Sequence, residues 1–65
     1  MQDWQQRVVG EKAELDDRLN KLFTFFGSKI FDSLPEAEQK RMRRQGTFME
    51  LYSDVLAERI ENFTK

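Results

Sequence analysis

Two apolar stripes with helical spacing are the feature that most limits what this chain can fold into. In each stripe apolar side chains recur every three or four residues, which is the period of one face of an α-helix. Turn-forming residues separate the stripes: Gly27 suits the position that ends a helix, and Pro35 is tolerated in a first helical turn. The spacing predicts helices over residues 4–26 and 35–63, joined by a short helix at 29–33.

The two stripes fit one another when the long helices run antiparallel. A turn near residues 33–34 makes the numbers of facing residues sum to about 67, which places Trp4 opposite Phe63. The expected fold is all-α, a single domain over 1–65: an antiparallel two-helix hairpin with a short linking helix. The residues expected in its seam are Leu15, Leu19, Leu22, Met49, Tyr52, Leu56 and Ile60.

Polar residues interrupt both stripes. Glu11 fills a gap in the first stripe and is expected to pair with Arg59 at the edge of the seam. Gln45 occupies a seam position of the second stripe, beside Gly46, which weakens its helix because glycine is a poor helix former. Such polar groups usually fix the register of packed helices.

The shortness of the chain predicts a partner. With 65 residues a chain buries only about 60% of its unfolded surface. It has no Cys and no His, which excludes disulfides and a zinc site of the usual Cys/His kind. Phe48, Leu51 and Val55 form an additional apolar stripe beside the seam. We therefore expect self-association into a helical bundle, most simply a homodimer.

The sequence carries no enzyme motif. Its three glycines are too scattered to form a phosphate loop, and without His or Cys a Ser-His or Cys-His nucleophilic site is impossible. The acidic residues have the spacing of solvated helix faces rather than of a metal cluster. We expect no enzymatic activity, no catalytic or metal-binding residue and no cofactor.

A basic run is the densest charge feature. Lys40, Arg41, Arg43 and Arg44 lie within five residues and are candidates for contact with phosphate or with an acidic partner. The alternative is a solvated face on which Lys40 pairs with Glu36. The net charge of −1 argues against non-specific affinity for nucleic acid.

An aromatic cluster surrounds the expected turn. Phe23, Phe25, Phe26 and Phe31 are candidates for stacking on bases. Filling the closed end of the hairpin under the short helix is the favoured interpretation, because two diverging helices need filling there. No apolar run approaches the length of a membrane span and the first residues lack the layout of a signal peptide, so a cytoplasmic protein is expected.

Apolar and charged positions over nearly the whole chain carry a resemblance to a known group. They are Arg7, Val8, Glu11, Lys12, Leu15, Leu19, Lys21, Leu22, Phe26, Phe31, Leu34, Pro35, Glu38, Gln39, Gln45, Met49, Tyr52, Ser53, Val55, Leu56, Arg59 and Ile60. With them the chain resembles a widespread group of very short proteins encoded by bacteriophages and prophages, gut phages included. The resemblance implies a protein that acts by binding in the bacterial host cell, in host takeover or counter-defence.

Three functions stay open at this point. The leading hypothesis is a protein that binds a host protein through an exposed helix face. The second is an oligomeric sponge that traps a signalling nucleotide between protomers, with Arg41, Arg43 or Arg44 on the phosphate and an aromatic ring on the base. The third is a nucleic-acid-binding regulator.

Overall fold

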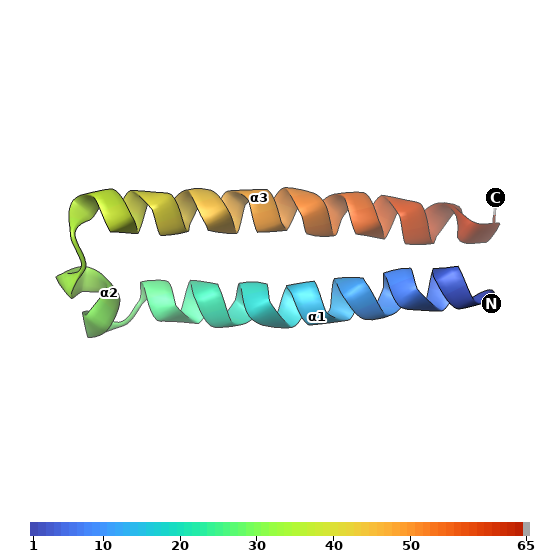
Figure 1. Cartoon of the computed structure of the whole chain (residues 1–65), viewed down its shortest axis with the longest axis horizontal. Coiled ribbons are helices and arrows are strands. Elements are labelled where there is room, and N and C mark those ends of the chain that lie inside the picture. Colours follow the sequence, from blue (N-terminus) through green and yellow to red (C-terminus); the bar gives the residue numbers. More distant parts are fainter. Residues whose placement is uncertain (65) are drawn as a thin grey trace.

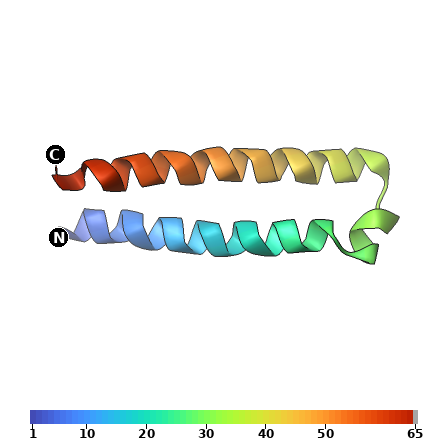
Figure 2. The same cartoon turned by 180° about the vertical axis from the view of Figure 1, so that it is seen from behind.

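A computed structural model of the chain describes residues 1–64. It contains three α-helices, α1 (Asp3–Phe26), α2 (Lys29–Ser33) and α3 (Glu36–Glu61), and a final 3₁₀ turn, η1 (Asn62–Thr64). The described part of the chain has no strand, which confirms the all-α class. The long helices α1 and α3 lie side by side, with α2 at one end and both termini at the other (Figure 1). The view from behind shows the same pairing along the full length of both helices (Figure 2).

Side chains from both neighbouring segments hold the short helix α2. Ser28 caps its beginning, where the hydroxyl accepts a hydrogen bond from the backbone N–H of Phe31 at 3.1 Å. At its end, Nε2 of Gln39 on α3 donates to the carbonyl oxygens of Phe31 and Leu34, both at 3.0 Å. The Phe31 carbonyl also accepts from the backbone N–H of Leu34 at 3.1 Å, so Gln39 adds a second donor there and ties the connecting turn to α3.

The core lies along the contact between α1 and α3. Val8, Leu15 and Leu19 are buried on α1, and Leu56 is fully buried on α3. The remaining aliphatic seam candidates, Leu22, Met49 and Ile60, are half-buried.

Two inward positions of α3 differ by one residue from the predicted ones. Gly46 and Ser53 take the inward positions, whereas Gln45 and Tyr52 are exposed. The expectation that Tyr52 lies in the seam is therefore wrong: its side chain is 44% exposed. Small residues point inward because they allow the two helix backbones to approach each other.

Gly46 shows how close this approach is. A Cβ atom built on Gly46 would lie 3.1 Å from Cε1 of Phe23 and 3.5 Å from Cδ2 of Leu22. The side chains of α1 thus pack directly over the backbone of α3. Gly46 fills a contact position and is not merely a weak point of its helix.

A polar cluster crosses the seam at Ser53. Nζ of Lys12 lies 2.6 Å from Oδ2 of Asp16 and donates to Oγ of Ser53 at 3.1 Å. The hydroxyl of Ser53 donates to Oδ1 of Asp16. Hydrogen bonds from Lys12 and then from Ser53 lower the pKa of Asp16 below its usual value. The pair expected at this edge does not form: Glu11 and Arg59 are exposed, and no ion pair joins them in residues 1–64.

Aromatic side chains close both ends of the helix pair. At the termini the rings of Trp4 and Phe63 meet edge to face, with centroids 5.2 Å apart, as the predicted register requires. At the other end Phe31 of α2 is 1% exposed. Its centroid lies 4.9 Å from that of Phe26 and 5.9 Å from that of Phe25. This confirms that the aromatic cluster fills the closed end.

The molecule is a rod of 46 × 14 × 14 Å. Its radius of gyration is 14.9 Å, whereas about 11 Å is expected for a compact domain of this length. Each long helix is therefore covered along one side only.

Candidate ligand groove on α3

The four residues of the basic run make different contacts. Nζ of Lys40 lies 3.4 Å from a carboxylate oxygen of Glu36, and Nε of Arg41 lies 2.9 Å from one of Glu38. Both pairs lie within one helix and are exposed, so each contributes little to stability. The Lys40–Glu36 pair is the one that the solvated-face alternative predicts.

Arg43 packs against the aromatic end of the molecule. Its guanidinium carbon lies 5.4 Å from the ring centroid of Phe26 and 5.1 Å from that of Phe31. At this distance the cation is attracted to the electron-rich ring faces. Arg43 thus belongs to the packing around α2, and the four basic residues do not form one continuous surface.

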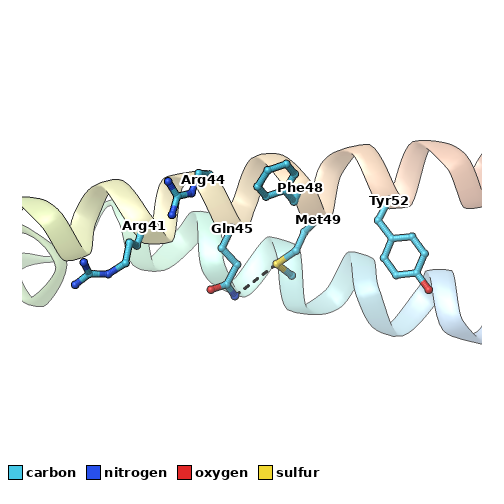
Figure 3. A pocket seen from close by; sticks show the side chains of 6 residues that line it. All are labelled: Arg41, Arg44, Gln45, Phe48, Met49 and Tyr52. Carbon is cyan, nitrogen blue, oxygen red and sulfur yellow. Dashed lines mark hydrogen bonds between the residues drawn. The ribbon is translucent and has the colours of Figure 1, made fainter.

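The other two arginines open onto a groove along α3. Figure 3 shows its lining side chains in order along the helix, with the arginines toward α2 and the tyrosine at the far end. We call this feature the α3 groove; its lining residues are Arg41, Arg44, Gln45, Phe48, Met49 and Tyr52. Nε2 of Gln45 contacts Sδ of Met49 at 3.8 Å and so orders the middle of the groove.

Arg44 is the cation with free binding capacity in this groove. No ion pair, hydrogen bond or ring contact holds its guanidinium in the part of the chain that the structure describes. A guanidinium presents a planar fork of N–H donors that matches a phosphate or carboxylate. The Arg41 guanidinium lines the same groove, and its exposed pair with Glu38 is easily exchanged for a stronger anion.

Aromatic rings line the groove beyond the arginines. The side chain of Phe48 is 62% exposed, and Tyr52 also presents its ring to solvent. Exposed rings beside cations are the combination that proteins use for bases and their phosphates. Residues 1–64 contain no group of three or more His, Cys, Asp or Glu residues that could hold a metal ion.

The additional apolar stripe adjoins the groove. Leu51 and Val55 are 55% and 51% exposed on α3, and Phe48 belongs both to this stripe and to the groove. We call Phe48, Leu51 and Val55 the outer stripe. Its position beside the seam agrees with the sequence prediction, while its role as a contact surface stays a prediction.

The sequence identified the cations of the groove but not its other lining residues. Gln45 and Tyr52 were assigned to the seam, and the structure exposes both of them in the groove instead, whereas Met49 packs against the core and also lines the groove. The usable signal was the pair of small residues Gly46 and Ser53, seven residues apart, which marks the contact side of α3.

Comparison with known families gives a match over almost the whole chain. The family model described as Sequestin covers residues 2–62. The chain belongs to the Sequestin family. Searches of curated proteins and of solved structures find no match for this chain. The family name denotes sequestration, which agrees with a protein that acts by binding. None of the described helices of the chain is long and apolar enough to cross a membrane.

Proposed function

We propose that this member of the Sequestin family is a non-enzymatic binding protein that sequesters a nucleotide in the α3 groove. One observation carries the proposal: the guanidiniums of Arg41 and Arg44 and the exposed rings of Phe48 and Tyr52 line a single groove. A nucleotide carries a phosphate and a flat base in one small molecule, and the groove offers a partner for each.

The phosphate is assigned to the arginine end. Hydrogen bonds between a guanidinium and phosphate are charge-assisted and often bidentate, which makes them stronger than neutral ones. Arg44 has no competing partner within residues 1–64, so it binds the phosphate without losing another contact. Arg41 exchanges its exposed contact with Glu38 for the phosphate.

The base is assigned to the ring of Phe48 or Tyr52. Stacking of a base on an aromatic side chain contributes roughly 1–3 kcal/mol and tolerates different bases. A small ligand is favoured over nucleic acid because, among residues 1–64, two cations line the groove, and the chain has a net charge of −1. Long nucleic acids are held by many more phosphate contacts.

Sequestration is a function that requires no chemistry. A protein that binds a signalling nucleotide lowers its free concentration, and the effect depends on affinity and on the amount of protein. With the resemblance to very short phage proteins, this supports a role in counter-defence inside a bacterial host. The host enzyme that answers to the nucleotide would then remain inactive.

The test is isothermal titration calorimetry with a panel of linear and cyclic mono- and dinucleotides, with inorganic phosphate alone as a reference. Arg44→Glu should abolish nucleotide binding. Lys40→Glu is the matched control, because it makes the same charge change on the same helix outside the groove and should bind like the parent. Equal affinity in both variants, or no binding by the parent chain to any of the panel, would refute the proposal.

Binding of a host protein is the second candidate function. The outer stripe favours it, since large exposed apolar side chains at helical spacing mark contact surfaces. A nucleic-acid regulator makes a different prediction: affinity for single-stranded DNA should fall steeply with salt. Retention of affinity for a mononucleotide in high salt separates stacking in the groove from that alternative.

A further inference from the structure

We infer that the charge of the rod is divided along its length, so that the molecule attracts short anions to its basic half and repels nucleic acid with its acidic half. The binding of a nucleotide rests on the proposed function, whereas the repulsion of nucleic acid follows from the distribution of charge. Three features support the inference: the division itself, the length of the rod, and a row of acidic side chains without ion pairs.

The antiparallel pairing of the long helices defines two halves of the rod. The hydrogen bond between Asp16 on α1 and Ser53 on α3 lies near the middle of both helices. We call residues 18–49, which include α2, the turn half, and residues 1–17 together with 50–64 the terminal half. Figure 1 shows α2 at one end of the rod and both termini at the other.

The two halves carry charge of opposite sign. The turn half has seven basic and three acidic side chains, a formal charge of +4. The terminal half has three basic and nine acidic side chains, a formal charge of −6. This division is hidden in the order of the sequence, because the first 33 residues hold five basic and six acidic side chains. The fold produces it by bringing the two ends of the chain together.

The length of the rod lets the two halves act separately on a ligand. The rod measures 46 Å, whereas the Debye length is about 8 Å at physiological ionic strength. At a helical rise of about 1.5 Å per residue, Asp54 lies about 15 Å and Glu58 about 21 Å along α3 from Arg44. A mononucleotide at Arg44 therefore interacts mainly with the turn half. A longer strand that extends along the rod brings phosphates close to both halves.

Acidic side chains of α3 in the terminal half lack compensating cations. Glu50, Asp54 and Glu58 follow one another at intervals of four residues, and each is exposed without an ion pair within residues 1–64. Like charges at this spacing destabilise a helix. By contrast, both acidic residues in the first turn of the same helix form ion pairs. A local arrangement that costs stability is expected where it contributes to function.

The test compares the binding of a short and a long polyanion at low salt. The probes are labelled oligothymidylates of three and about 20 nucleotides, followed by fluorescence anisotropy and expressed per trinucleotide position. Asp54→Lys/Glu58→Lys changes the charge of the terminal half from −6 to −2 and retains every residue that lines the groove. This variant should bind the long strand at least tenfold more tightly than the parent, with nearly unchanged affinity for the short strand. No gain for the long strand would overturn the inference.

Asp32→Lys/Glu36→Lys is the matched control, because it makes the same change of net charge within the turn half. It should raise the affinity for both strands, so that the ratio of the two affinities stays close to that of the parent. An equal rise of this ratio in the two variants would show that net charge alone decides, and would overturn the inference. Circular dichroism establishes that each chain is helical before it is titrated.

A salt series on the parent chain gives a second measurement that needs no variant. Binding to nucleic acid through cations normally weakens with salt more steeply for a ligand that makes more phosphate contacts. Here salt also screens the repulsion by the terminal half, so affinity for the long strand should fall less steeply than affinity for the short one. A steeper fall for the long strand would contradict the inference.

The outcomes separate this inference from the proposed function. If the parent chain binds no mono- or dinucleotide but Asp54→Lys/Glu58→Lys gains the long strand, the proposed function fails and the repulsion stands. If the parent binds a nucleotide and this variant gains nothing for the long strand, the inference fails and the proposed function stands.

Discussion

The hydroxyl of Ser53 on α3 donates a hydrogen bond to the carboxylate of Asp16 on α1, across 2.5 Å and through the middle of the helix pair. Lys12 completes the arrangement, so each of the three polar groups has two partners. A shift of α3 by one turn would break the hydrogen bond to Asp16 or the one from Lys12. The contact therefore fixes the register between α1 and α3 in a way that apolar packing alone does not.

The hydrogen bonds of Asp16 predict a contribution to the free energy of unfolding that is lost in acid. Because its pKa is lowered from 3.8 in the folded chain, ionised Asp16 stabilises the fold above that pH. This contribution is lost as the pH falls through the lowered pKa. Asp16→Asn should be less stable than the parent at neutral pH, and the difference should shrink in acid. Thermal unfolding followed by circular dichroism at several pH values measures it.

Asp17→Asn is the matched control for this prediction. Asp17 is the next residue, and its pair with Lys21 at 3.0 Å is exposed on both sides. The stability difference between Asp17→Asn and the parent should be small at every pH. An equal pH dependence in the two variants would show that Asp16 contributes no more than a surface charge.

Substitution by alanine should have different effects on stability at the glycines of the two long helices, because their surroundings differ. A Cβ at Gly10 meets nothing within 4 Å, so Gly10→Ala should stabilise the chain by about 0.5–1 kcal/mol through helix propensity. Gly46→Ala gains the same propensity but must displace the ring of Phe23, so its net gain should be smaller. Thermal unfolding of both variants tests this order. A larger gain at Gly46 would mean that the helices are less closely packed than described.

Substitutions of the two neighbouring arginines, Arg43 and Arg44, should separate an effect on stability from an effect on binding. Arg43→Met should lower the free energy of unfolding by about 0.5–1 kcal/mol, because it removes the cation from the rings of Phe26 and Phe31. Arg44→Met should leave stability nearly unchanged and weaken nucleotide binding. Unfolding curves and calorimetric titrations of both variants measure the two effects. A stability loss in Arg44→Met equal to that in Arg43→Met would contradict the assignment.

Substitutions of Gln39 test whether its side-chain amide stabilises the position of α2. Gln39→Ala should destabilise the chain by about 1 kcal/mol, because the carbonyls of Phe31 and Leu34 lose the hydrogen bonds from the Gln39 amide. Gln39→Glu should be more destabilising than Gln39→Ala, since a carboxylate would face carbonyl oxygens. Thermal unfolding ranks the three chains. A Gln39→Glu variant as stable as the parent would show that the amide does not donate to these carbonyls.

The sequence was sufficient for the helices and the ends of the molecule, but not for every inward position of α3. Helical periodicity gave the pairing of Trp4 with Phe63 because both are large and lie at opposite ends of matching stripes. It misplaced Tyr52 because the outer stripe is as apolar as the seam and draws the apparent apolar face outward. Gly46 and Ser53 contribute almost nothing to an apolar pattern, although the closest approach of two helices requires small residues.

The candidate site was predictable only in part for a related reason. The basic run is evident in the sequence, but its division depends on where α2 folds back. Phe31 draws Arg43 to the aromatic end, and this leaves Arg44 to the groove. Neither outcome follows from the periodicity of α3 alone, because a contact with a separate element decides it.

The edge-to-face contact of Trp4 with Phe63 has a practical consequence for spectroscopy. Trp4 is the single tryptophan of the chain, and it lies at the end where both termini meet. Its emission therefore reports separation of the terminal ends, whereas circular dichroism reports the helices as a whole. Fraying would change the fluorescence signal before the ellipticity. A single coincident transition in the two signals would mean that the rod unfolds as one cooperative unit from end to end.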